Sequence, residues 1–152
     1  MTRVASCSCG QLSVTLSGEP HEVTVCHCLQ CQKSTGSAFG AYAFWPRSAC
    51  RSIQGEAKHW RRVSDSGHWV ESSFCPICGS TIGFHRVHKT SLAVGSFNQP
   101  EALLAPGVLV QHVWFREHIS WFDTVDDWPR YPAFPPGRDA ELEELNGQAI
   151  AG

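Results

Sequence analysis

The middle of the chain carries a short cysteine turn that reads Cys75-Pro76-Ile77-Cys78-Gly79. Two residues between the cysteines let both sulfurs face one ion, and the glycine after the second cysteine lets the turn close. Zn²⁺ binds thiolates at the corners of a tetrahedron, so one such turn supplies only part of a site. The turn is therefore typical of a zinc knuckle, and its remaining ligands must come from another part of the chain.

Two further cysteine groups could complete this site. One is Cys7-Ser8-Cys9-Gly10 near the N-terminus, and the other is Cys26-His27-Cys28-Leu29-Gln30-Cys31. Joining Cys7 and Cys9 to the knuckle gives a closed four-cysteine site that ties the start of the chain to its middle. This pairing leaves Cys26, Cys28 and Cys31 as a separate group, the arrangement expected of a zinc ion that keeps one position open for water or substrate.

Other interpretations of the cysteines stay open at this stage. A second structural zinc site would form if Cys50 or a histidine completed the group of three, and without metal the same CxCxxC run permits thiol redox chemistry. Cys50 stands alone and is expected to be a small core residue. Disulfides are disfavoured, because a bridge within a CxC pair would be strained and no signal peptide is evident. The histidines that could act as a fourth ligand are His27, His59, His68, His85, His88, His112 and His118.

The composition excludes several classes of function. The 152 residues fit one domain, and 42% of them are hydrophobic, with six Trp and eight Phe available for a core. The net charge is -2 and the longest basic run is the pair Arg61-Arg62, so nucleic acid is not expected as a partner. The chain shows no signal peptide and no membrane-spanning apolar run, so we expect a cytoplasmic protein with no membrane partner.

Short alternating segments between turn residues predict a mainly β fold made of antiparallel sheets. Gly55-Glu56 separates two of these segments and predicts a β-hairpin. Residues 27–35 are expected to form a metal-binding loop with a single helical turn. The expected strands cover residues 11–17, 23–25, 38–45, 52–54, 58–63, 68–74, 81–84, 90–95 and 111–115.

The C-terminal end has a different character. Residues 139–145 could form a short acidic helix, but Pro132, Pro135, Pro136 and Gly137 precede it. We therefore expect a zinc-binding domain over residues 1–131, followed by an extended or mobile tail over residues 132–152.

The order of these motifs resembles the glutathione-dependent formaldehyde-activating enzyme family, also called the S-(hydroxymethyl)glutathione synthase or centromere protein V family. The matching residues are Cys7 to Gly10, Cys26 to Cys31 with Lys33 and Gly36-Ser37, Gly55-Glu56, Phe74 to Ser80, Val94-Gly95-Ser96, and His112 with Trp121, Asp126 or Asp127 and Pro129. In two places the chain departs from the pattern. Gln32 stands where a basic residue is common, which weakens the case for an anionic substrate beside it, and Trp60 stands where a tyrosine is common.

This resemblance implies a zinc-stabilised fold of stacked, mostly antiparallel sheets with two Zn²⁺ ions per chain. The structural zinc would lie on Cys7, Cys9, Cys75 and Cys78. The zinc associated with activity would lie on Cys26, Cys28 and Cys31, which makes these three the candidate catalytic residues through the metal.

We therefore expect a carbon-sulfur lyase in which glutathione or another thiol adds reversibly to formaldehyde or a related small aldehyde. Its partners would be these small thiol and aldehyde substrates. His27 is the candidate base nearest in sequence to the metal ligands. The alternative is a non-catalytic zinc scaffold or protein-interaction module of the same fold, which a fourth protein ligand on the second zinc would favour.

Overall fold

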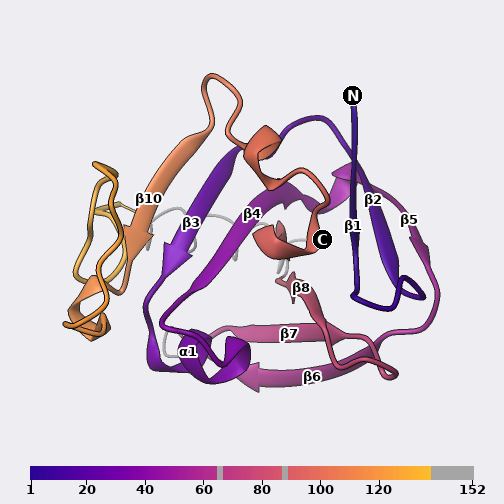
Figure 1. The fold of residues 1–152 in the computed structure, drawn as a ribbon, viewed down its shortest axis with the longest axis horizontal. Coiled ribbons are helices and arrows are strands. Elements are labelled where there is room, and N and C mark those ends of the chain that lie inside the picture. The colour runs from indigo at the N-terminus through magenta and orange to yellow at the C-terminus, as the bar shows by residue number, and fades with distance from the viewer. Residues whose placement is uncertain (65–66, 87–88, 138–152) are drawn as a thin grey trace, which may run out of the picture.

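Two β-sheets build the protein, as a computed structural model that describes residues 1–64, 67–86 and 89–137 shows (Figure 1). The predicted mainly β fold of stacked sheets is confirmed. Neighbouring strands run antiparallel except β10 and β3, which are parallel. The small sheet has the order β1 (Thr2–Ser6), β2 (Ser13–Ser17), β5 (Cys50–Gln54). The large sheet has the order β10 (Leu109–Val113), β3 (Glu22–Cys26), β4 (Gly40–Pro46), β9 (Lys89–Ala93), β8 (Thr81–His85), β7 (Trp69–Phe74), β6 (Lys58–Val63).

Within the described residues, helical structure is limited to short elements, and the helix at the metal-binding loop has seven residues, more than the single turn predicted there. The α-helix of the described residues is α1 (Leu29–Thr35), which begins after Cys28 and ends at Gly36 in the left-handed conformation with φ 62°. The Cys28 sulfur accepts a hydrogen bond from the Cys31 amide at 3.3 Å and so caps the helix. The 3₁₀ turns are η1 (Arg47–Ala49), η2 (Val94–Ser96), η3 (Pro100–Leu103) and η4 (Phe115–Glu117).

The helix predicted over residues 139–145 lies outside the described residues. Within them, no helix is long and apolar enough to cross a membrane.

The core lies between the two sheets. In a strand, side chains alternate between the two faces, so each sheet can bury one face and present the other. The small sheet contributes Ala5, Val14 and Leu16 to the core, and the large sheet contributes residues that include Ala43 and Trp45, both fully buried. This packing leaves the other face of the large sheet for a pocket.

That second face carries a row of side chains that runs across the sheet. The register pairs Trp60 with Ser72, Ser72 with Phe84, Phe84 with Ser91, and Ser91 with Phe44. All five residues therefore point to the same side of the sheet, and all line one pocket. β3 continues the row with Thr24 and Cys26, which lead directly into the three-cysteine group.

The hairpin predicted around Gly55-Glu56 is wrong. Its two arms, β5 and β6, belong to different sheets: β5 pairs with β2, and β6 pairs with β7. Gly55 has φ 83°, and a Cβ atom built there would lie 1.7 Å from the Gln11 carbonyl oxygen. The glycine therefore permits a close crossing of two chain segments, where the chain passes from one sheet to the other, rather than a turn that pairs its own flanks.

Candidate metal centres

The first cysteine group forms where the two sheets meet. Cys7 and Cys9 follow β1, whereas Cys75 and Cys78 lie in the turn between β7 and β8. All four sulfurs lie within 4.8 Å of one another, with Cys7 and Cys75 buried and Cys9 and Cys78 exposed. The fold thus brings together the four residues that the sequence assigned to one site.

Hydrogen-bond donors lie close to these sulfurs, and they lower the pKa of Cys75 and Cys78. The Leu12 amide donates to the Cys7 sulfur at 3.3 Å, and Gln11 Nε2 donates to the Cys75 sulfur at 3.0 Å. The Ser80 hydroxyl lies 3.2 Å from the Cys78 sulfur, and with the backbone amides of Ser80 and Cys9 it lowers the Cys78 pKa to about 5. Four clustered cysteine sulfurs fit a tetrahedral metal ion such as Zn²⁺, which binds cysteines as thiolates.

The second group lies at the edge of the pocket. Cys26 ends β3, Cys28 caps α1, and Cys31 lies in the first turn of that helix; their sulfurs also lie within 4.8 Å of one another. Hydrogen bonds from the Cys26 and Cys31 thiols lower the pKa of Cys28, whereas the contacts of Cys26 with Cys28 and Cys31 raise the pKa of Cys26. Negative charge therefore concentrates on the middle sulfur, and this group could also bind a metal ion.

No fourth His, Cys, Asp or Glu from residues 1–64, 67–86 or 89–137 joins the three sulfurs. Six of the candidate histidines fall within these residues, whereas His88 lies outside them. Cys50 is part of neither group and packs against the core, as the sequence predicts. In the described part of the chain the second group is thus a three-thiol set.

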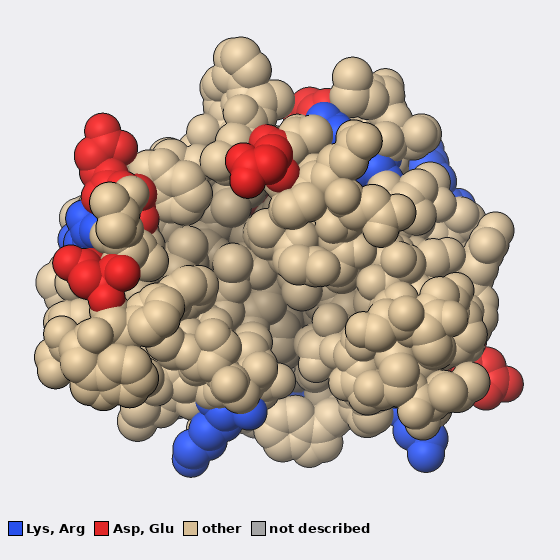
Figure 2. All heavy atoms as spheres, viewed as in Figure 1, with Lys and Arg blue, Asp and Glu red and all other residues tan. Residues whose placement is uncertain are grey.

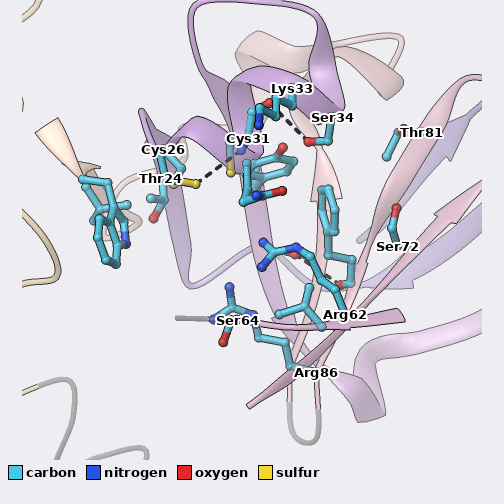
Figure 3. A pocket seen from close by; sticks show the side chains of 18 of the residues that line it. Thr24, Cys26, Cys31, Lys33, Ser34, Arg62, Ser64, Ser72, Thr81 and Arg86 are labelled. Carbon is cyan, nitrogen blue, oxygen red and sulfur yellow. Dashed lines mark hydrogen bonds between the residues drawn. The ribbon is translucent and has the colours of Figure 1, made fainter. Parts of the chain in front are cut away.

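The pocket beside this set has a volume of about 550 Å³ and includes all three cysteines in its lining (Figure 3). Its walls are rich in aromatic side chains, and its lining carries the cations Lys33, Arg62 and Arg86 without an aspartate or glutamate. In Figure 3, Cys26 and Cys31 lie at one end and Arg86 at the other, with Arg62 between them. Pockets of this size and apolar character bind small molecules.

His27 does not take part in this pocket. Its ring points to the opposite face of β3, where Nε2 lies 2.9 Å from Nδ1 of His112, and Nε2 of His112 lies 3.0 Å from Oδ1 of Asp126. Burial, followed by the neighbouring His112, lowers the pKa of His27 to about 4. The position of His27 therefore does not support a role as the base. Instead, the hydrogen bonds that join His27, His112 and Asp126 fix the loop that carries the cysteines.

Asp126 is the acidic residue of the Asp126-Asp127 pair that completes this chain of contacts. Hydrogen bonds hold its pKa below the usual value despite partial burial, which acts in the opposite direction. Because a carboxylate only accepts, His112 Nε2 must donate to Asp126. Figure 2 shows acidic side chains gathered over this segment, which follows β10, and none of its acidic residues lines the pocket.

Several pocket residues were not evident from the sequence. Gln32 occupies the position where a basic residue is common in the similar family. Its side chain turns away from the pocket and donates through Nε2 to the carbonyls of His27 and Glu117. Besides Lys33, positive charge comes from Arg62 on β6 and Arg86 just after β8, which are far from Cys31 in sequence. The one indication in the sequence was the alternation of side chains along β6, which places Arg62 on the opposite face of the strand from Arg61.

Comparison with known proteins agrees with this architecture. A family model described as "Glutathione-dependent formaldehyde-activating enzyme" matches residues 2–117, a range that includes both cysteine groups. The crystal structure of a protein from Rhodobacter sphaeroides is similar to this chain, with a TM-score of 0.52 at 16% identity, covering 67% of this chain and 95% of that chain. This likeness concerns the fold. A search of curated proteins found no match.

Proposed function

This chain belongs to the glutathione-dependent formaldehyde-activating enzyme family, and from that premise we propose that it catalyses the reversible addition of a small thiol to formaldehyde or a related small aldehyde. Glutathione is the first candidate for the thiol. The observation that carries the proposal is a three-thiol group, with no fourth ligand among the described residues, that opens into a pocket of small-molecule size.

Two zinc ions fit the cysteine sets. Cys7, Cys9, Cys75 and Cys78 would hold a structural ion, and Cys26, Cys28 and Cys31 would hold the ion of the active site. When bound, the second ion supplies Lewis acidity that lowers the pKa of a thiol in the pocket.

The addition balances without a further reactant. A bond forms between the thiol sulfur and the aldehyde carbon, the carbonyl double bond becomes a single bond, and the thiol proton leaves to water. The former carbonyl oxygen takes a proton from water and becomes the hydroxyl of the adduct. The pocket residues orient the two reactants, and its aromatic walls exclude bulk water.

The charges of the pocket suit a thiol that carries a carboxylate, as glutathione does. Its lining includes the cations Lys33, Arg62 and Arg86, and none of the described residues that line it is an aspartate or glutamate. Guanidinium groups bind carboxylates through paired N–H donors. Arg62 lies between the cysteines and Arg86 in Figure 3, so its guanidinium could contact the carboxylate of a thiol whose sulfur is near the cysteines.

An Arg62→Gln variant should bind glutathione about tenfold more weakly, because a charge-assisted contact to a carboxylate is lost. The diethyl ester of glutathione, which lacks the carboxylates, should bind the variant and the wild type equally. Titration calorimetry with the zinc-loaded protein measures both affinities.

The matched control is Arg61→Gln. Arg61 is the adjacent residue on β6, points to the other face of the sheet and pairs with Glu71 at 2.9 Å. The Arg61→Gln variant therefore removes the same charge from a position outside the pocket. Equal losses of affinity in the two variants would indicate a general charge effect and contradict a specific carboxylate contact at Arg62.

The activity itself is tested by exchange NMR of glutathione with formaldehyde. We expect the zinc-loaded protein to accelerate interconversion of the free thiol and its hydroxymethyl adduct above the spontaneous rate. A rate equal to that of the buffer, at a protein concentration where glutathione binding is saturated, would reject this substrate pair.

A second candidate function is a non-catalytic interaction module. The observation that favours it is a group of exposed apolar side chains on the segment after β10, where Trp121 is 81% exposed, next to the partly exposed Phe122. Exposed aromatic groups of this kind occur at protein interfaces. An inactive protein that binds two zinc ions would favour this candidate.

A further inference from the structure

The hydroxyl of Tyr42 is an unusual feature of the pocket. Tyr42 on β4 is 4% exposed and lines the pocket, yet its Oη atom has no hydrogen-bond partner in the described part of the chain. A buried polar group without a partner destabilises a fold, because it has lost its water and gained nothing in exchange. Its presence beside a reaction site therefore needs an explanation.

The backbone holds this hydroxyl close to the three-thiol group. Gly40 lies two residues before Tyr42 on the same face of β4 and pairs across the sheet with Cys26. A Cβ atom on Gly40 would lie 2.2 Å from the Tyr42 hydroxyl, so the phenol folds back over the glycine toward Cys26. An ordinary phenol has a pKa of about 10, so the Tyr42 hydroxyl is available as a proton donor at neutral pH.

Other pocket hydroxyls near the cysteines already donate elsewhere. Thr24 donates to the buried Glu22, Ser34 donates to the Cys31 carbonyl at 3.2 Å, and Ser91 donates to the Phe84 carbonyl at 3.2 Å. Ser72 and Thr81 lie on the side of the pocket away from Cys26 and Cys31 in Figure 3. Tyr42 thus presents a hydroxyl that lies near Cys31 and Ser34 but completes no hydrogen bond with any described residue.

We propose that Tyr42 is a catalytic residue whose hydroxyl donates a hydrogen bond to the aldehyde oxygen as the thiol adds. This inference rests on the proposed function and assigns the position of the reacting carbonyl. Negative charge develops on that oxygen when the sulfur–carbon bond forms, and a fixed donor in a pocket with little water stabilises it. Tyr42 keeps its own proton, and the oxygen is protonated by water, so the step stays balanced.

A Tyr42→Phe variant tests this role, since it removes only the hydroxyl. We expect kcat to fall about 100-fold, the effect of losing one donor to a developing oxyanion. Affinity for glutathione and zinc content should stay unchanged, because neither thiol nor metal binding uses the hydroxyl. Thermal unfolding should shift upward by about 2 °C or more, because an unpartnered buried group has been removed.

Tyr131→Phe is the matched control, since it removes the hydroxyl of the other tyrosine of the chain, which does not line the pocket. It should leave kcat within about twofold of the wild type. An unchanged kcat in Tyr42→Phe, or a lowered unfolding temperature with loss of zinc, would overturn the catalytic role and make the hydroxyl structural. A wild type without any acceleration would overturn the proposed function and this inference with it, whereas the Tyr42 outcomes leave the proposed function intact.

Discussion

A Cys28→Ser variant is expected to bind one zinc ion per chain instead of two and to lose more than about 100-fold of the thiol-addition rate. Cys28 is the middle sulfur of the three-thiol group, and its neighbours' thiols concentrate negative charge on it. A hydroxyl is a poor zinc ligand compared with a thiolate. Metal analysis gives the stoichiometry, and exchange NMR of glutathione with formaldehyde gives the rate.

The substitution is chosen so that the fold survives. Cys28 also caps α1, and serine is among the best residues for that position, so the helix keeps its first hydrogen bond. Cys50→Ser is the control, because Cys50 lies outside both cysteine groups. Two zinc ions and a normal rate in Cys28→Ser would show that this group does not hold the active metal.

The cysteine groups could be predicted from the sequence because their chemistry is local. A CxxC turn and a CxCxxC run place sulfurs on one side of a short loop, and only one long-range pairing, between Cys9 and the knuckle, had to be inferred. Most strands were found for the same reason, since alternation is visible within a few residues, but β1 at Thr2–Ser6 was not predicted.

Long-range pairing explains what the sequence did not reveal. The segments around Gly55 look like hairpin arms, but β2 and β7 offer each arm a better partner, and a two-residue pattern carries no information about distant strands. Arg62 and Arg86 reach the pocket only because the large sheet brings β6 and β8 opposite the cysteine loop.

The face to which the His27 side chain points also could not be predicted from the neighbouring residues in the sequence. It lies between two cysteines, which suggests a role in the pocket, but alternation along the extended segment turns it to the other face. Only the structure shows that His27 forms a hydrogen bond with His112 there, and that His112 in turn bonds to Asp126. These contacts join β10 and the following segment to the metal-binding loop.

The second large effect concerns stability. A Cys75→Ser variant should lower the midpoint of thermal unfolding by more than about 10 °C, because structural zinc contributes folding free energy directly and a serine leaves the ion with three thiolates. Cys75 is fully buried, and Gln11 Nε2 donates to its sulfur at 3.0 Å. Circular dichroism during heating, with and without a zinc chelator, measures the shift.

Comparison with Cys28→Ser separates the two sites. Both variants should lose one zinc ion, but the four-cysteine site joins the segment after β1 to the turn between β7 and β8, whereas the three-cysteine group lies within one short stretch of chain. Losing the first site frees a long loop, and losing the second frees only a few residues, so the unfolding midpoint should fall far more in Cys75→Ser. Equal midpoints in the two variants would contradict the division into a structural and an active-site ion, because the stability of the fold would then not depend on which site holds the metal.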